Sequence, residues 1–75
     1  IATALGNATT ASGFASTAMG SAASTNGKSG SFVIGDFTSS FSNGLLESSA
    51  DNEFSTRFSG GYRLFTNATR SQGLA

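Results

Sequence analysis

The phrase Thr3-Ala4-Leu5-Gly6 returns fourteen residues later as Thr17-Ala18-Met19-Gly20, and a third time as Phe32-Val33-Ile34-Gly35. The third copy arrives one residue late relative to the first interval. A short fixed period built from single-strand phrases is typical of a stacked β-solenoid, and it is too short for a repeat of paired helices. The sequence therefore predicts that residues 1–36 form successive coils of a parallel β-roll.

Side chains alternate between two faces along each phrase. The first and third positions of an extended strand share one face, and the second position lies on the other. Equivalent residues of successive coils would stack about 4.8 Å apart. A flexible Gly/Ser linker has a similar composition, but a random linker would not keep register at the apolar positions. We therefore expect an apolar core ladder, formed by Leu5, Met19, Phe32 and Ile34.

Glycine recurs where the predicted strands end. Gly13 and Gly27 repeat the fourteen-residue interval midway between the phrases. Glycine adopts positive φ without a steric penalty, which suits it to tight turns. The predicted turn glycines are Gly6, Gly13, Gly20, Gly27 and Gly35 in the repeat, and Gly60 and Gly61 in a later turn.

Two segments of the second half lack any period. Residues 37–50 are interpreted as a loop excursion, which Leu45-Leu46 could anchor on the core. Residues 68–75 show neither helical nor strand-like apolar spacing and are expected to be a connector.

A closing β-hairpin is predicted for residues 51–67. Apolar and polar side chains alternate on both sides of Ser59-Gly60-Gly61. A three-residue loop there would place Phe58 opposite Tyr62 and keep the apolar faces together, whereas a two-residue turn would mix them. The aromatic side chains of this part are expected in the core or at a trimer interface rather than on a ligand platform, and they are Phe54, Phe58, Tyr62 and Phe65.

Composition limits the possible functions. A chain of 75 residues is one domain or an excerpt of a longer protein. Its first half has too few large apolar side chains to offset its ordering entropy without partner chains or a longer array. The net charge is zero, and the sequence has no basic patch of the kind that binds nucleic acid. Cysteine and histidine are absent, so the segment has no thiolate or imidazole ligands and no Ser/His or Cys/His nucleophile. We predict no enzyme activity, no cofactor, no metal site and no direct membrane insertion.

Three apparent site motifs have simpler interpretations. Residues 22–29 end like a phosphate-binding loop, but Ala22 stands where the first glycine is required and no helical pattern follows. Asp51 and Glu53 could suggest a carboxylate pair or a calcium site, but acids this close in sequence more often mark a solvated strand edge. Two Asn-X-Thr triplets, starting at Asn7 and Asn67, fit the motif for N-glycosylation. In a chain this rich in Asn, Ser and Thr, chance explains these triplets better.

The run from Ala2 to Gly20 resembles the head repeat of YadA-like trimeric autotransporter adhesins, whose phrase is Ser-Val-Ala-Ile-Gly with an Ala-Ser-Gly-like turn half a period later. Thr3 and Thr17 replace the usual valine. Residues 30–36 and 52–67 resemble the segment that closes such arrays, also in bacterial surface proteins and phage-type fibres with an endosialidase-type intramolecular chaperone. The apolar position of the phrase is matched by Leu5, Met19 and Ile34.

The resemblance implies a left-handed parallel β-roll, three copies of which pack into a homotrimer. Small residues such as Ala4 and Ala18 would then permit close approach of neighbouring coils or subunits. The implied location is extracellular, on a bacterial cell surface or on a virion or particle fibre. The implied partners are the other copies, neighbouring domains of the fibre, and a surface receptor, matrix or glycan. The chain departs from the family by lacking its basic neck motif and a heptad stalk.

We therefore expect a structural and adhesive segment of a trimeric fibre, in which weak contacts multiply across copies. A phage tail or injection-particle fibre segment is the second hypothesis. An ice-binding solenoid is a third, from another class, although the threonines at positions 3 and 17 are expected to face inward. A polysaccharide-degrading fibre enzyme would need carboxylates from a partner chain or from another domain.

Overall fold

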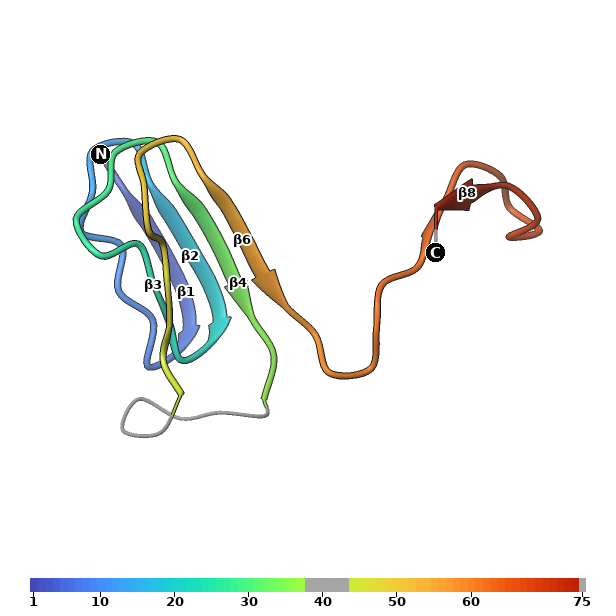
Figure 1. The fold of residues 1–75 in the computed structure, drawn as a ribbon, viewed down its shortest axis with the longest axis horizontal. Helices are drawn as coiled ribbons and strands as arrows, with labels where there is room; N and C mark the ends of the chain where they lie inside the picture. The colour runs from blue at the N-terminus through green and yellow to red at the C-terminus, as the bar shows by residue number, and fades with distance from the viewer. Residues whose placement is uncertain (38–43, 75) are drawn as a thin grey trace.

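The computed structural model describes residues 1–37 and 44–74, which form strands and turns without a helix (Figure 1). This confirms the all-β prediction for the described part of the chain. The strands are β1 (Thr3–Asn7), β2 (Thr17–Ser21), β3 (Ala23–Ser24), β4 (Phe32–Gly35), β5 (Leu46–Glu47), β6 (Phe54–Arg57), β7 (Leu64–Phe65) and β8 (Gly73–Leu74).

The main sheet has the strand order β1-β2-β4-β6, and every neighbouring pair in it is parallel. Thr3 pairs with Thr17, Thr17 with Phe32, and Phe32 with Phe54. The first two intervals are the fourteen and fifteen residues that separate the repeated phrases. The third is longer because the chain has additional residues between the end of β4 at Gly35 and the start of β5 at Leu46. The internal repeat therefore predicts the register of the first three strands correctly.

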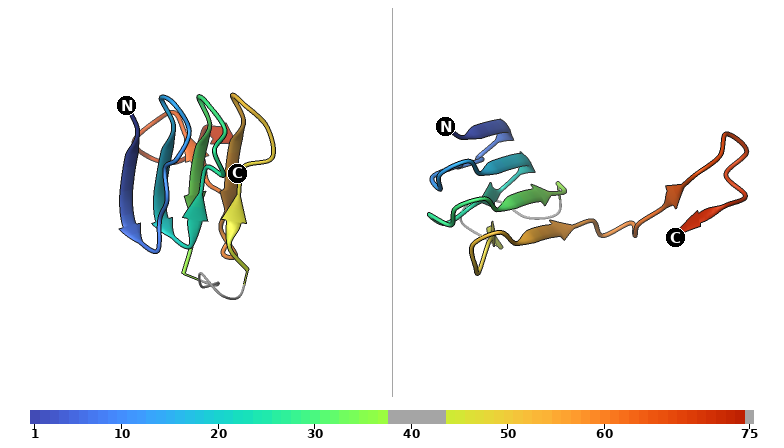
Figure 2. Two further views of the ribbon diagram at one scale, coloured as in Figure 1. Left: turned by 90° about the vertical axis from the view of Figure 1, so that its left-hand side faces the viewer. Right: turned by 90° about the horizontal axis from the view of Figure 1, so that it is seen from above.

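A second, smaller sheet faces the main one (Figures 1 and 2). β3 and β5 are parallel, and Thr10 adds an isolated bridge to Ser24 at their edge. The chain thus passes from the main sheet to the second and back in each successive turn. The predicted excursion at 37–50 needs correction, because Leu46–Glu47 returns as β5 and Leu46 packs on the core. Its residues 38–43 lie outside the described part.

The space between the two sheets is filled by small side chains. Ala18, Ala23 and Val33 are fully buried there. A single residue, Ala22, separates β2 from β3 and has a left-handed φ of 53°, so the corner is tight and the enclosed space is narrow. The buried polar side chains are Ser16, Ser24, Thr25, Ser31 and Ser48.

The residues of the predicted core ladder stack in register, but their side chains lie on the outward face of the main sheet and not in the core. Leu5 is 56% exposed and Phe32 is 39% exposed, while Met19 and Ile34 are half-buried. Thr3 is exposed as well, so the expectation that the threonines face inward is wrong. The physical reason is size, because the narrow interior accommodates Ala18 and Val33 and excludes the larger side chains.

Several predicted turn glycines lie inside strands instead. Gly6 and Gly20 stack on each other within β1 and β2, and Gly35 continues the row in β4. A Cβ atom at Gly6 would overlap the carbonyl group of Gly20, so close backbone approach requires glycine there. Of the others, Gly13 is buried at a bend, and Gly27, Gly60 and Gly61 do lie in turns. Left-handed corners are also occupied by Ala8, Ala15, Asn26 and Asn52.

The predicted closing hairpin at 51–67 is wrong in its strand pairing. β6 pairs in parallel with β4 and completes the main sheet. The antiparallel pair is formed one segment later by β7 and β8, with Leu64 opposite Leu74 and Phe65 opposite Gly73. The predicted connector at 68–75 therefore contains β8, and its last residue lies outside the described part.

Asn67 organises the loop between β7 and β8. Its side-chain Oδ1 accepts the backbone N–H of Ser71 at 3.0 Å, and the N–H of Thr66 donates to the Gln72 carbonyl at 2.8 Å. Residues 60–74, which we call the arm, project away from the two sheets (Figures 1 and 2).

Candidate interaction surface

The outward face of the main sheet carries two rows of stacked side chains. Both rows run across the four strands and contain no charged residue. The first row is Thr3, Thr17, Phe32 and Phe54, and the second is Leu5, Met19, Ile34 and Thr56. Exposed apolar surface that is contiguous in this way marks an interaction site more often than scattered exposed residues do.

The phenylalanine pair of the first row is ordered. The rings of Phe32 and Phe54 meet edge to face, with centroids 5.6 Å apart and an interplanar angle of 86°. Phe54 is nevertheless 68% exposed. Such a pair contributes about 0.5–1.5 kcal/mol beyond area burial, and its open side remains available for contact.

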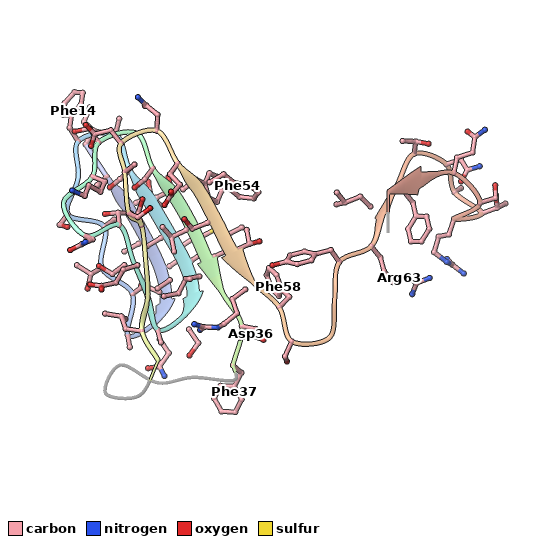
Figure 3. All side chains as sticks on the ribbon, viewed as in Figure 1. Phe14, Asp36, Phe37, Phe54, Phe58 and Arg63 are labelled. Carbon is pink, nitrogen blue, oxygen red and sulfur yellow. The ribbon has the colours of Figure 1, made fainter. Side chains whose placement is uncertain are left out.

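The second row ends at the base of the arm. The Thr56 Oγ1 hydroxyl donates to the Tyr62 hydroxyl at 2.7 Å, and the Tyr62 ring meets Phe58 edge to face at 5.6 Å. Phe58 and Tyr62 therefore contact each other as expected, but through a turn closed by the Gly61 N–H on the Phe58 carbonyl rather than through paired strands. Figure 3 shows Phe54 and Phe58 on the side from which the arm leaves.

None of the four predicted aromatics lies in the core of the described chain. Phe54, Phe58 and Tyr62 are exposed by 68%, 38% and 49%, and Phe65 is half-buried. The Arg63 guanidinium lies 5.0 Å from the Phe65 ring centroid, in cation–π geometry. The core alternative is therefore wrong for these residues, and the interface alternative stays a prediction.

An ion pair joins the ends of β4 and β6. The Arg57 Nε donates to the Asp36 Oδ1 at 3.2 Å, and the Asp36 Oδ2 accepts the backbone N–H of Ser59 at 2.6 Å. Arg57 also donates to the Gly44 carbonyl at 2.9 Å. The pairing of Arg57 with Asp36 was not predicted from the sequence, although an acid directly after one strand and an arginine at the end of the next are a usable signal. Their role is to fix the origin of the arm.

The Glu53 side chain is surrounded by serines at the corner before β6, and they donate hydrogen bonds to its carboxylate. Its carboxylate accepts the Ser49 N–H at 2.7 Å, the Ser49 hydroxyl at 2.6 Å and the Ser55 hydroxyl at 2.9 Å. These hydrogen bonds, the Ser49 N–H first among them, lower the pKa of Glu53 from 4.5 to about 2. Glu53 is therefore a structural anion that ties β5 to β6.

The other acidic residue of the pair serves a different corner. The Asp51 Oδ1 accepts the Ser29 N–H at 2.9 Å, so Asp51 and Glu53 do not form a joint site. Among the residues that the structure describes, no group of three or more Asp or Glu side chains could hold a metal ion.

The phosphate-loop alternative has no structural counterpart. Ala22 and Thr25 are fully buried, and the segment continues through a turn at Asn26 into the next strand rather than into a helix. The Thr25 Oγ1 accepts the Ser12 N–H at 2.9 Å and the Ser16 hydroxyl at 3.2 Å. This stretch therefore cross-links successive turns of the chain.

Within residues 1–37 and 44–74, no helix is long and apolar enough to cross a membrane. The chain matches no protein-family model, and no curated protein and no solved structure is significantly similar to it.

Proposed function

We propose that the chain is a structural and adhesive segment of a trimeric extracellular fibre, in which its stacked turns form a left-handed parallel β-roll. The handedness and the number of copies follow the resemblance to YadA-like heads. The function is to hold a repetitive surface rigidly and to attach the fibre to cells or matrix through many weak contacts.

The observation that carries the proposal is the second row on the outward face of the main sheet, in which Leu5 is exposed and Met19 and Ile34 are half-buried. Leu5, Met19 and Ile34 stack in register on a face that the described chain leaves uncovered. Burying apolar surface contributes about 25 cal/mol per Å², so covering this row with other copies would add substantial stability. A regular one-chain β-structure has no comparable reason to align large apolar side chains outward.

The thin interior supports the same proposal. The fully buried apolar side chains of the described residues are alanines and one valine, which supply little hydrophobic stabilisation. Small domains of this length bury only about 60% of their unfolded surface. Association of copies through the outward rows would supply the missing burial.

The same physical assembly would serve a phage tail or injection-particle fibre. The gene that encodes the chain discriminates between the two settings, because an adhesin continues into a C-terminal membrane barrel and a fibre into a self-cleaving chaperone or tail-gene neighbours.

The outward row does not favour ice binding. Thr3 and the half-buried Thr17 lie on the outward face, as an ice-binding ladder would require, but Phe32 and Phe54 continue their row. Two threonines followed by two aromatic rings do not form the flat array of hydroxyls that such a surface needs.

Adhesion is tested by coating beads with the purified chain and measuring retention on mammalian cell monolayers and on plates coated with extracellular matrix. We expect the wild-type chain to be retained and Leu5→Ser, which removes one rung of the row, to bind at least tenfold more weakly at equal chain concentration because avidity is lost. A Glu47→Gln control variant, at an exposed position on the second sheet, should bind like wild type. If the coated beads are retained no better than uncoated beads, the chain is a spacer and not an adhesive segment.

A further inference from the structure

We propose that residues 60–74 are an exchange arm, whose β7–β8 pair lies on the outward apolar row of a neighbouring copy. This inference rests on the proposed assembly of several copies and adds which surfaces meet in it. The occupant of the row is thus a defined segment of a second copy of the same chain.

The arm touches its own chain through Tyr62, but its β7–β8 pair packs on no other strand of the described chain. Within the described residues, β7 and β8 contact each other and no other strand. Leu64 is 59% exposed, although it alternates with a half-buried Phe65. A two-stranded hairpin alone is marginally stable in water, so the arm needs a second surface to become ordered.

The arm leaves the body on the side of the apolar rows. Tyr62 is held by the Thr56 hydroxyl, and Thr56 is the last member of the row that contains Leu5 and Met19. Both ribbon views place the arm on the side of the main sheet, opposite the β3–β5 sheet (Figures 1 and 2). A second copy that faces this sheet therefore lies in the direction of the arm.

The two surfaces match in chemistry. The rows of the main sheet present apolar side chains and threonines without a charge, so an apolar segment can cover them without burying an unpaired ion. On the arm, Leu64 supplies an exposed apolar side chain. The Arg63 guanidinium already lies over the Phe65 ring, which provides a partner for its charge beside the contact.

The absence of cysteine makes a disulfide test clean. Chains that carry Leu64→Cys are refolded together with chains that carry Met19→Cys and oxidised mildly. Each chain has one thiol, so a mixed disulfide joins two copies. We expect this product to be at least tenfold more abundant than the one formed with Glu47→Cys, an exposed control position on the second sheet. Leu5→Cys, which is more exposed than Met19, is the second partner if Met19→Cys does not fold.

The outcomes separate this inference from the proposed assembly. If light scattering gives several copies but Leu64→Cys joins neither row position, or joins Glu47→Cys equally well, the arm lies elsewhere and the inference is overturned. A dominant product between two Met19→Cys chains would mean that the rows meet each other directly, with the same consequence. A mass of one chain for every variant would instead overturn the assembly itself.

Discussion

Leu5 lies directly beside Met19 across β1 and β2, and both side chains point away from the interior that their neighbour Ala18 fills. Leu5 is 56% exposed in this position, while Ala18 is fully buried. The large and small residues of the repeated phrase therefore have opposite tasks. Ala18 fills the space between the two sheets, whereas Leu5 and Met19 lie on the outward face.

Enlarging the interior face should destabilise the fold. Ala18→Leu adds three carbon atoms where no space remains, and overpacking of this kind costs about 1–3 kcal/mol. The matched change on the outward face, Met19→Leu, conserves volume and should cost less than about 1.5 kcal/mol. Urea denaturation followed by circular dichroism compares the two. Equal midpoints for the two variants would show that the interior is not the narrow side.

Gly6 should not tolerate a side chain, although it lies in a strand and not in a turn. Its φ of 124° and the nearby Gly20 carbonyl both oppose a Cβ atom. We expect Gly6→Ala to lower the free energy of unfolding by more than about 1 kcal/mol. Gly60→Ala is the control, because a Cβ at that turn position meets open space and should change stability by less than about 0.5 kcal/mol. Thermal melts of both variants decide the matter.

Acid should loosen the corner held by Glu53. The folded pKa of about 2 lies below the unfolded value near 4.5, so the unfolded chain takes up the proton more readily. The stability that this group contributes is therefore fully present above pH 4.5 and is lost as the pH falls towards 2. Melting temperatures of wild type and Glu53→Gln should converge over this window and stay apart at pH 7. Parallel curves for the two proteins would contradict a role for the Glu53 charge.

Removing one rung of the outward row should weaken association more than folding. Leu5→Ser removes a side chain that is already largely exposed in the single chain but would be covered in the assembly. Burial of a leucine contributes about 1.5–3 kcal/mol, which corresponds to a tenfold or larger increase in the dissociation constant. Analytical ultracentrifugation over a concentration series measures the change. The control is Glu47→Gln on the second sheet, which should leave the dissociation constant unchanged. If Leu5→Ser leaves it unchanged as well, the interface lies away from this row.

The repeated phrase predicted the strand register because parallel stacking brings equivalent residues together. The interval between Thr3 and Thr17 is the register of β1 and β2. The single additional residue before Phe32 lengthens the next interval in the same way, so that Thr17 pairs with Phe32 of β4. Alternation also placed Leu5 and Met19 on one face correctly. It could not say which face is inside, since this depends on the distance between the two sheets, and that distance is set by the one-residue corner at Ala22.

The pairing of β6 was missed for a related reason. Alternation at Phe54 and Thr56 is compatible with a parallel or an antiparallel neighbour, and the inserted segment hid the repeat that relates Phe54 to Phe32. The β7–β8 pair was missed because Gly73 is close to Leu64 and Phe65 only after the Asn67 loop has formed. The sites of Glu53 and Arg57 depend on backbone groups brought together by folding, which residue types alone do not reveal.

The most direct test of the proposed assembly is the mass of the folded chain in solution, measured by multi-angle light scattering alongside circular dichroism. The account predicts a β-rich spectrum and three times the 7.5 kDa mass of one chain. A β-rich spectrum with the mass of a single chain at every concentration would contradict it, because the outward row of Leu5, Met19 and Ile34 would then remain uncovered in the native protein.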